Sequence, residues 1–473
     1  MNCELITNAS CANIGSKSIA LFFAGWGMDA TPFRNMAIDC DMAVVWDYSN
    51  LEIDLSILRE YQSIYLFAWS FGIFAATAFM HRNPQLPIVF KMAINGTQFP
   101  IDDRCGIPRN LFCATRDNLS ERSLAKFHRR ICGSQSKYAQ WITMLPSRSL
   151  QSLHDELVAI DTAASSGNYP PVHWDKAIAS KCDLIFPFEN QMTGWEGLCD
   201  TIEIDETSAH FPDDLETLIN GNIINKKLIK QRFANSLNGG TYDNNASIQQ
   251  KIATTLHDLW KSTIGIKNDA EILEIGCGTG FLTRLYATSA YPAKLVLNDL
   301  CHVPTVTLNL NVTDYMFIEK DAEQLTFPAH SFDYIVSSSA IQWLENLPLF
   351  FNRIHRWLKH GGAIVISTFG SNNMKEIKES IKISLNYKGA DWYYNDIKRN
   401  FDIVLINEQH ETMLFDTPLD VLRHIQSTGV NSINNKKASS GTIKRLLMNY
   451  PQVGGKFPLT YNPIYIIAIK NDK

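Results

Sequence analysis

The sequence has no paired cysteines, no long apolar segment and no excess of positive charge. Its ten cysteines are scattered, without a C-x-x-C pair or the spacing of metal ligands, so we expect reduced thiols and no bound metal. No apolar run reaches the roughly 18 residues of a membrane helix, and no basic segment with an apolar core opens the chain. The net charge of −5 gives no support to nucleic-acid binding. These absences predict a cytoplasmic globular protein that binds neither membranes nor nucleic acids.

The length of the chain argues against a single hydrophobic core. At 473 residues it exceeds the size at which one core stops growing, so we expect two or three domains. No internal repeat or low-complexity segment divides the sequence. The domains must therefore be recognised by their motifs.

Three glycines follow an apolar run past the middle of the chain. Residues 271–280 read EILEIGCGTG, which predicts a strand that turns into a helix. Glycines let the backbone turn tightly and approach a ligand, while the helix start offers free N–H groups. In the dinucleotide fingerprint G-x-G-x-x-G the last glycine comes one position later than Gly280, which disfavours a pyrophosphate ligand. Asp299, at the end of the next predicted strand, has the spacing of an acid that binds ribose hydroxyls.

Two more predicted strands carry acids or hydroxyls near their ends. Residues 317–322 read FIEKDA, residues 331–339 read SFDYIVSSS, and Gln342 and Trp343 follow. A glycine turn alone is weak evidence, but a purely structural loop leaves each later match unexplained. The ordered set resembles the class I S-adenosylmethionine-dependent methyltransferases, which have a Rossmann-like fold. The resemblance implies S-adenosylmethionine as cofactor and, as its binding residues, Glu274, Gly276, Cys277, Gly278, Gly280, Asp299, Asp321, Ala322 and Ser339.

A serine in the first part of the chain has the context of a nucleophile. Residues 61–72 read YQSIYLFAWSFG, a buried strand that leads into a helix-like stretch at 73–81. The pattern is that of a nucleophile elbow in which Ala68 replaces the first glycine of G-x-S-x-G, and a small residue there still permits the sharp turn. Ser70 is therefore the predicted nucleophile. The alternative is an ordinary serine at a helix N-cap.

Two aspartates and a histidine follow Ser70 in the order that α/β-hydrolases use. Asp102 and Asp103 come after the next predicted strand, and either one is the expected acid of the triad. His210 is the expected base, oriented by the aspartate. It lies in a loop beyond two later strands, which we expect around residues 184–188 and 201–204.

The same region predicts an oxyanion site and a cap. The oxyanion donors would be the backbone N–H groups of Phe71, directly after the nucleophile, and of Trp26, in an earlier glycine turn. The insertion before His210 contains amphipathic stretches at 119–131 and 149–164, which suit a cap over an acyl slot. Its basic run at 126–130 is either a docking face for an acidic partner or a solvated helix face.

Several ordered motifs of this half resemble the pimeloyl-acyl-carrier-protein methyl ester esterases of the BioG type. They read GWG at 25–27, AWSFG at 68–72, NGT at 95–97, PIDD at 100–103, GIP at 106–108, RRICG at 129–133 and AHF at 209–211. The resemblance covers roughly the first 215 residues. It implies an α/β-hydrolase domain with a helical cap, serine esterase activity, and acyl carrier protein as the partner.

The second half carries motifs beyond the glycine turn. Residues 422–431 read LRHIQSTGVN, residues 455–461 read GKFPLTY and residues 367–370 read STFG, and these resemble malonyl-acyl-carrier-protein O-methyltransferases of the BioC type. We place the domain boundary at a polar seam, so that residues 1–218 form the hydrolase domain and residues 219–473 the methyltransferase domain. We expect Arg423 to hold the substrate carboxylate and Tyr242 to act as a lid hydroxyl. Tyr242 and Gln249 stand where an N-terminal lid, with helices at 226–237 and 247–259, closes on the cofactor.

Together the two halves predict a bifunctional enzyme of biotin synthesis. One half would methylate the free carboxylate of malonyl-acyl-carrier protein, and the other would hydrolyse pimeloyl-acyl-carrier-protein methyl ester to the free acid and methanol. Two alternatives stay open. The first half is an inactive hydrolase that serves only to dock the carrier protein, or the second half methylates a free small molecule such as a quinone precursor. The sequence does not indicate an oligomeric state.

Overall fold

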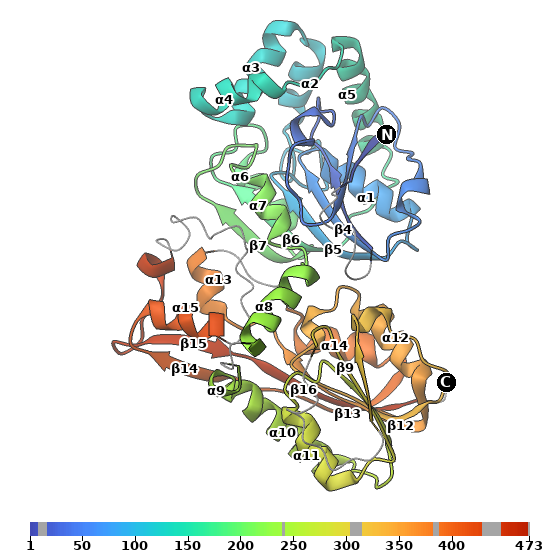
Figure 1. Cartoon of the computed structure of the whole chain (residues 1–473). Coiled ribbons are helices and arrows are strands. Elements are labelled where there is room, and N and C mark those ends of the chain that lie inside the picture. The colour runs from blue at the N-terminus through green and yellow to red at the C-terminus, as the bar shows by residue number, and fades with distance from the viewer. Residues whose placement is uncertain (8–16, 239–241, 303–314, 382–386, 428–445, 472–473) are drawn as a thin grey trace. The chain divides into compact units, whose positions relative to one another are not determined.

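The computed structural model describes residues 1–7, 17–238, 242–302, 315–381, 387–427 and 446–471. The chain forms two compact units, and the division between them falls after Ile223 (Figure 1). Each unit is built around its own seven-stranded sheet, and buried hydrophobic residues cover both faces of each sheet.

The first unit alternates strands and helices along most of its length. Its sheet has the strand order β1-β3-β2-β4-β5-β6-β7, and every pair is parallel except β1 with β3. The strands are β1 (Asn2–Ile6), β2 (Ser18–Phe23), β3 (Asp41–Trp46), β4 (Ser63–Trp69), β5 (Ile88–Ile94), β6 (Trp174–Ser180) and β7 (Cys199–Asp205). The helices are α1 (Gly72–Arg82), α2 (Arg109–Asp117), α3 (Glu121–Cys132), α4 (Gln135–Trp141), α5 (Leu150–Ser165), α6 (Phe188–Trp195) and α7 (Leu215–Asn220).

Consecutive residues of β2 face opposite sides of this sheet. Leu21 and Phe23 belong to one buried cluster, while Ala20 and Phe22 belong to another. All four side chains are fully buried. The strand reads as a continuous apolar run because a parallel sheet covered on both faces leaves no side for polar residues.

One predicted strand of this unit lies elsewhere. The apolar residues 184–188, expected as a strand, form a connection that leads into α6, and the strand at this place in the sheet is β6, Trp174–Ser180. β6 does not read as an apolar strand in the sequence, because it contains the charged residues Asp175 and Lys176. Lys176 forms an ion pair with Glu203 of β7, which keeps its charge paired beside the sheet. The other predicted strand, at 201–204, lies within β7.

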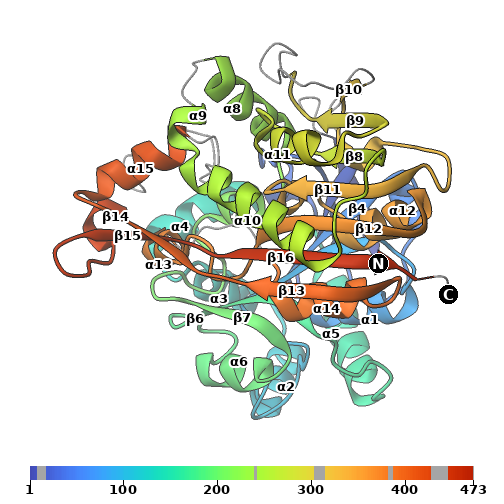
Figure 2. The same cartoon turned by 90° about the horizontal axis from the view of Figure 1, so that it is seen from below.

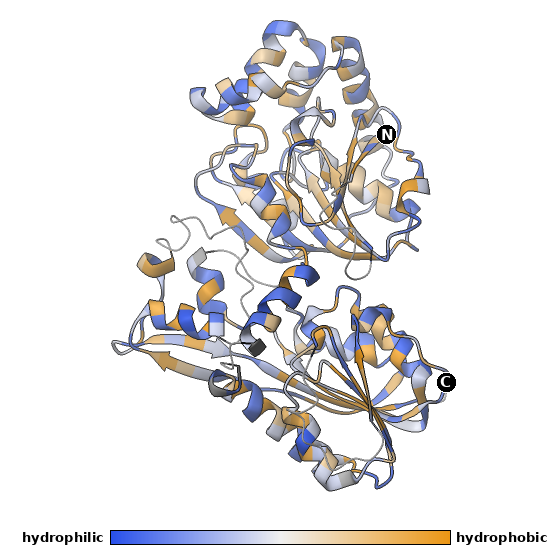
Figure 3. Ribbon diagram, viewed as in Figure 1, coloured by the Kyte–Doolittle hydropathy of each residue, from blue (hydrophilic) through white to orange (hydrophobic). Residues whose placement is uncertain are grey.

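Four helices in the long connection between β5 and β6 gather at one end of the first sheet (Figure 1). As predicted, α3 and α5 occupy the amphipathic stretches 119–131 and 149–164, and Figure 3 shows hydrophobic and hydrophilic residues mixed along them. Their apolar residues are turned toward the sheet: Phe112 of α2 and Leu153 of α5 share one buried cluster with Trp26 and Phe71. The four helices therefore form a cap on this unit.

The second unit begins with helices and then alternates strands and helices. Its helices are α8 (Lys226–Asn238), α9 (Tyr242–Asn245), α10 (Ser247–Thr263), α11 (Phe281–Ala290), α12 (Leu347–Trp357), α13 (Lys375–Ile381), α14 (Ala390–Ile397) and α15 (Pro418–Ser427). The strands are β8 (Glu271–Ile275), β9 (Lys294–Asp299), β10 (Tyr315–Glu319), β11 (Phe332–Ser338), β12 (Leu358–Phe369), β13 (Phe401–Glu408), β14 (Glu411–Phe415), β15 (Phe457–Tyr461) and β16 (Pro463–Lys470).

The main sheet of the second unit has the strand order β10-β9-β8-β11-β12-β16-β13, which can be followed in Figure 2. The strands from β10 to β12 are parallel, and β16 is antiparallel to both of its neighbours. After β8 the chain first adds strands on one side of it and then, from β11 on, adds them on the other. Such a reversal leaves a crevice beyond the carboxyl ends of the two central strands, where α/β proteins bind ligands.

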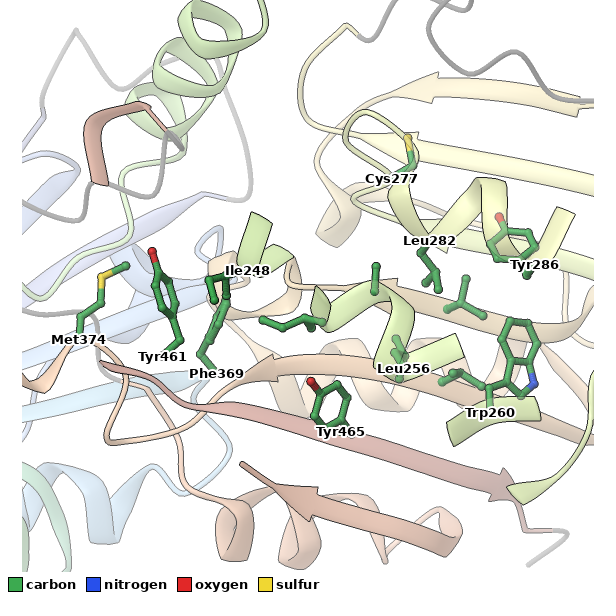
Figure 4. Packing of buried hydrophobic residues seen from close by; sticks show 14 of the residues in the cluster. Ile248, Leu256, Trp260, Cys277, Leu282, Tyr286, Phe369, Met374, Tyr461 and Tyr465 are labelled. Carbon is green, nitrogen blue, oxygen red and sulfur yellow. The ribbon is translucent and has the colours of Figure 1, made fainter. Parts of the chain in front are cut away.

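The two faces of this sheet bury different helices. Ile272 of β8 packs in the cluster that contains α10 and α11, whereas its neighbour Leu273 packs with α12 and α14 on the opposite face. Figure 4 shows Leu256 and Trp260 of α10 on the first of these faces. Both units therefore have the predicted α/β architecture. In the part of the chain described, no helix combines the length and the hydrophobicity that crossing a membrane requires.

Candidate active sites

Ser70 stands in a strained turn between β4 and α1. Its φ of 59° lies in the left-handed region that only glycine adopts freely, and such strain is typical of a nucleophile elbow. Its backbone N–H donates to the carbonyl of Ile94 at 3.0 Å. Gly72 permits the turn, because a Cβ on this residue would lie 2.3 Å from the carbonyl oxygen of Phe23. The sequence at this position is thus dictated by the close approach of α1 to β2.

His210 and Asp183 complete a hydrogen-bonded series with Ser70. Nε2 of His210 lies 2.9 Å from Ser70 Oγ, and its Nδ1 lies 2.8 Å from Asp183 Oδ2. Since a carboxylate only accepts hydrogen bonds, Nδ1 carries the proton and Nε2 is free to accept the serine proton. Asp183 is held in turn by the backbone N–H groups of Ile185 and Phe186, at 2.8 and 3.0 Å. All three side chains are buried.

Asp102 and Asp103 do not take the role that the sequence suggested. Oδ1 of Asp102 accepts hydrogen bonds from the backbone N–H groups of Arg104 and Cys105, each at 2.8 Å, and Oδ1 of Asp103 accepts one from the backbone of Arg109 at 2.9 Å. Both residues are exposed. They shape a surface turn after β5. The acid that pairs with His210 is Asp183, in the loop after β6, the next strand of the sheet.

The missed acid follows directly from the misplaced strand. With a strand assigned to 184–188, Asp183 appears to stand before a strand and not after one. With the strand at its true place, 174–180, Asp183 follows its carboxyl end by three residues. The signal that identifies it is therefore an acid in a short loop after a strand, between the serine and the histidine in chain order.

The turn that carries Trp26 lies against the nucleophile. A Cβ on Gly25 would be 3.2 Å from Ser70 Cβ, so this turn and the elbow are in close contact. The indole Nε1 of Trp26 donates to the carbonyl of Leu153 in the cap at 3.0 Å. Neither the Trp26 nor the Phe71 backbone N–H donates a hydrogen bond to another described residue. Two such free donors beside a nucleophile are what an oxyanion hole requires.

The loop that carries His210 is fixed by the core and by the cap. The carbonyl of His210 accepts hydrogen bonds from Trp69 Nε1 at 2.9 Å and from Asn95 Nδ2 at 2.8 Å. Gly133, at the end of α3, has a φ of 69°, and a Cβ there would lie 2.5 Å from Ala209 Cβ. Motif residues far apart in the sequence therefore meet around His210.

The outer face of α3 is basic. Arg122, Lys126, Arg129 and Arg130 are exposed, and their spacing places them on one side of the helix. None of the four forms an ion pair with another residue in the described ranges, although the Arg129 guanidinium lies over the Tyr138 ring at 5.2 Å. The opposite side of α3 packs inward, where the Phe127 ring meets the Trp26 ring at 4.9 Å.

A cavity in the second unit lies at the crevice that its topology creates. It encloses about 980 Å³ of space, part of it open to solvent. Six predicted cofactor residues line it: Gly276, Gly278, Asp299, Asp321, Ala322 and Ser339. These residues lie at or just beyond the ends of four parallel strands, β8, β9, β10 and β11, so the strand ends that the sequence identified meet at one edge of the sheet.

The glycine loop is shaped as a cradle. Gly276 has a φ of 66°, and a Cβ there would lie 2.3 Å from Ala340 Cβ. Gly278 has a φ of 52° and faces open space, so a side chain on it would enter the cavity. Its backbone N–H donates to Asp299 Oδ2 at 2.9 Å, which ties the loop to the end of β9. Burial raises the pKa of the Asp299 carboxyl.

Lys226 of α8 is buried at one end of this cavity. Its Nζ lies 2.6 Å from Asp321 Oδ2 and also forms an ion pair with Glu323. Oδ1 of Asp321 accepts the backbone N–H of Glu323 at 3.0 Å. The first helix of the unit is thereby fastened over the acids that follow β10.

Three predicted cofactor residues do not line the cavity: Glu274, Cys277 and Gly280. Oε2 of Glu274 accepts hydrogen bonds from the hydroxyls of Thr283 and Tyr286, at 2.7 and 2.6 Å. Burial raises the pKa of Glu274 to about 7. This carboxyl connects β8 to α11, behind the glycine loop. Gly280 begins α11 with a φ of 85°.

Two side chains that line the cavity have buried polar atoms without a partner. Neither Nε2 nor Oε1 of Gln249, nor Oγ of Ser339, is hydrogen-bonded to another described residue. Gln249 is 6% exposed. Since buried polar groups in proteins are nearly always paired, these atoms indicate a polar ligand.

Of the two predicted substrate residues, the structure describes the side chain of Arg423 alone. Arg423 is exposed on α15 and pairs with Asp420 on the same helix at 3.0 Å. Tyr242 begins α9, and its side chain lies outside the described part of the structure, as does the motif segment 428–431. Within the described ranges, no group of histidine, cysteine or carboxylate side chains could hold a metal ion.

Comparison with known proteins identifies both units. The family model of the pimeloyl-ACP methyl esterase BioG matches residues 8–215, and a methyltransferase-domain model matches residues 273–366. The crystal structure of BioG from Haemophilus influenzae is 28% identical and covers 46% of this chain and 97% of that chain, with a TM-score of 0.41. The first unit thus contains a domain of the BioG esterase family, and the second contains a methyltransferase domain.

One named relative matches nearly the whole chain, and another matches about half of it. The malonyl-[acyl-carrier protein] O-methyltransferase of Bacteroides fragilis (strain 638R) is 37% identical over 481 residues, which span 99% of this chain and 95% of that protein. The protein of the same name from Haemophilus influenzae is 33% identical over 249 residues, 52% of this chain and 95% of its own length. Because the first of these relatives is matched from end to end, the chain belongs to the family of malonyl-[acyl-carrier protein] O-methyltransferases, in the form in which a BioG esterase domain precedes the methyltransferase domain.

Proposed function

We propose that the chain catalyses two reactions of biotin synthesis. Its second unit methylates the free carboxylate of malonyl-acyl-carrier protein with S-adenosylmethionine. Its first unit hydrolyses pimeloyl-acyl-carrier-protein methyl ester to pimeloyl-acyl-carrier protein and methanol. The observation that carries the proposal is the hydrogen-bonded series Ser70–His210–Asp183, found in a chain that a named methyltransferase matches along its whole length.

Hydrolysis of the ester would follow the acyl-enzyme route. Ser70 Oγ attacks the ester carbonyl while His210 Nε2 takes the serine proton, and Asp183 stabilises the resulting imidazolium. The N–H groups of Trp26 and Phe71 would stabilise the negative oxygen of the tetrahedral intermediate. His210 then gives its proton to the departing methoxy group, and methanol leaves. Water, deprotonated by His210, releases the acid from Ser70 and restores the hydroxyl.

The cavity of the second unit fits the cofactor that the methyltransferase family uses. The left-handed glycines provide space for a ligand against the backbone, and Asp299 suits ribose hydroxyls because a carboxylate accepts their hydrogen bonds. Asp321 would accept a hydrogen bond from the adenine amino group, and Ser339 has an unpaired hydroxyl. S-adenosylmethionine, when bound, supplies an electrophilic methyl group. Bound ligand would also satisfy the polar atoms that the cavity leaves without partners.

The substrate carboxylate needs little activation. A carboxyl with a pKa near about 4 is ionised at neutral pH, so no general base is required. The task of the protein is to bring a carboxylate oxygen close to the methyl group and to keep water out, and such positioning supplies much of the rate in reactions of this kind.

The two reactions oppose each other chemically, and acyl length would keep them apart. A methyl ester removes a charge that is costly to bury in the enzymes that elongate acyl chains. Two elongations add about four methylenes, each worth about 0.8 kcal/mol when buried. Phe71, next to Ser70 in the chain, belongs to a buried apolar cluster with Phe112 and Leu153 of the cap, and an acyl slot lined by such residues would favour the longer ester.

Two alternatives have less support. An inactive hydrolase that only docks carrier protein has no need for a strained serine, a correctly polarised histidine and two free N–H donors in one place. A methyltransferase for a free small molecule agrees poorly with the name of the full-length relative. Methylation of free malonate or malonyl-coenzyme A at the rate of the carrier-bound form would favour that second alternative.

The deciding measurement compares the full chain with its Ser70→Ala variant. Methanol release from pimeloyl-acyl-carrier-protein methyl ester should be lost in the variant, while methylation of malonyl-acyl-carrier protein should be kept. Failure of the wild-type chain to release methanol would refute the esterase assignment and favour the docking role.

A further inference from the structure

Gln249 is the buried polar side chain of the second unit that most clearly lacks a partner. It belongs to α10, lines the cavity and is 6% exposed. Both its amide nitrogen and its amide oxygen are without a hydrogen-bond partner among the described residues. Its neighbour Gln250 is exposed. An amide left this way inside a fold is expected to pair with a ligand, because an unmade hydrogen bond of a buried group is destabilising.

The surroundings of α10 place Gln249 at one end of the cavity. The preceding residue, Ile248, packs close to Phe369 and Tyr461 in Figure 4. Phe369 ends β12 and lines the same cavity. In the sheet order, β12 lies beyond β8 and β11, on the side opposite β9 and β10. Gln249 is therefore near the β12 end, away from the strands that carry Asp299 and Asp321.

The charges of the cavity assign the two ends different parts of a ligand. Asp299 and Asp321 line one end. Lys226 also lines this end, but it is paired with Asp321 and Glu323. With Asp299, three carboxylates stand against one ammonium group, so this end repels a carboxylate but accepts hydrogen bonds from hydroxyl and amino groups. The carboxylate of an amino acid should then lie at the opposite end, where Gln249 and Ser339 offer neutral polar groups. An amide can donate to the carboxylate and accept from the ammonium group. An isolated carboxylate would satisfy the amide nitrogen alone and would face the amide oxygen unfavourably.

We propose that Gln249 binds the amino-acid end of the sulfonium cofactor, with Nε2 donating to its carboxylate and Oε1 accepting from its ammonium group. This assignment rests on the proposed methyltransferase function and names a residue that acts in it. Ser339 Oγ is the second polar group available to the same end of the ligand.

The test compares two ligands that share an adenosine thioether but differ in the amino-acid part. Titration calorimetry with the full chain would measure the Kd of S-adenosylhomocysteine and of 5′-methylthioadenosine, which has no amino-acid group. In Gln249→Leu we expect S-adenosylhomocysteine to bind about tenfold to a hundredfold more weakly, as for lost hydrogen bonds to charged groups. The Kd of 5′-methylthioadenosine should stay as in wild type.

Two further variants sharpen the result. Gln249→Glu keeps an acceptor for the ammonium group but loses the donor to the carboxylate and adds a negative charge beside it, so it should bind S-adenosylhomocysteine more weakly than wild type does. Gln250→Leu is the matched control and should bind both ligands as wild type does. Equal weakening of both ligands in Gln249→Leu, or no weakening of either, would overturn the assignment. Wild-type protein that binds neither ligand would instead refute the cofactor itself.

Discussion

Oδ2 of Asp183 lies 2.8 Å from Nδ1 of His210, and the two residues come from loops after neighbouring strands of one sheet. This contact fixes the tautomer of the histidine, so that its other nitrogen faces Ser70. An amide in place of the carboxylate would present an N–H group to Nδ1 and favour the wrong tautomer.

Asp183→Asn should therefore lower kcat for methyl ester hydrolysis by about 10⁴, the scale known for the corresponding change in serine proteases. Asp102→Asn and Asp103→Asn are matched controls and should keep most of the activity, because their carboxylates bond only to backbone N–H groups of surface turns. A loss in Asp103→Asn as large as that in Asp183→Asn would contradict the triad described here.

The esterase should discriminate between esters by acyl length. If the additional methylenes of the pimeloyl chain are buried beside Phe112 and Leu153, they contribute up to about 3 kcal/mol, or a few hundredfold in kcat/KM. The measurement is methanol release from the malonyl and pimeloyl methyl esters, both on carrier protein, without methyl donor. Equal kcat/KM values for the two esters would contradict the proposal that acyl-chain length keeps the two reactions apart.

The basic face of α3 should recognise the carrier protein. The double variant Lys126→Glu and Arg130→Glu is expected to raise KM for the carrier-bound ester. Added salt should reduce the difference in KM between wild type and this variant, because salt screens exposed charges. Hydrolysis of a small ester such as p-nitrophenyl butyrate should be unaffected. Arg59→Glu, an exposed arginine of the same unit outside the cap, is the control, and an equal KM increase there would argue against a specific docking face.

Lys226 should be needed to hold α8 over the cofactor cavity. Removing its charge in Lys226→Met leaves the buried carboxylates of Asp321 and Glu323 unpaired, a change that typically costs about 3–5 kcal/mol. We expect a lower unfolding temperature of the second unit and weaker S-adenosylhomocysteine binding. Lys261→Met, which changes an exposed lysine of α10, should show neither effect. Partial recovery in Lys226→Met with Glu323→Gln would support the electrostatic cause.

Glu274 should make the stability of the second unit depend on pH. Burial raises its pKa to about 7 from an ordinary value near 4.5, so the folded state holds a proton that the unfolded state has lost. Its contribution to stability is then complete below about pH 4.5 and is lost as pH rises through 7, by about 3 kcal/mol in total.

Calorimetry at pH 5 and pH 8 checks this dependence on the transition that S-adenosylhomocysteine shifts. The stability of Glu274→Gln minus that of wild type should be larger at pH 8 than at pH 5. For the exposed Glu379→Gln, the same difference should not change with pH. A relative stability of Glu274→Gln that does not change with pH would show that the carboxyl is ionised in the folded protein at both values.

The sequence predicted the parts of both sites that are encoded locally. The elbow around Ser70, the glycine loop at Gly276 and Gly278 and the amphipathic cap helices each depend on residues close together in the chain, and periodicity and turn chemistry reveal them. The sequence also predicted His210, because its place in a loop after the last strand of the unit follows from the order of strands along the chain.

The remaining assignments depend on contacts that only the folded chain creates. Asp183 replaced Asp102 and Asp103 because the charged strand β6, and not the apolar residues 184–188, adds to the sheet beside β5. Glu274 turned away from the cavity to bond with α11, and Arg423 was found paired with Asp420. The sequence by itself determined which residues could take part in the chemistry. The tertiary structure decided which of them lie close enough to act together, because strand order and helix packing set the distances over which hydrogen bonds and charges act.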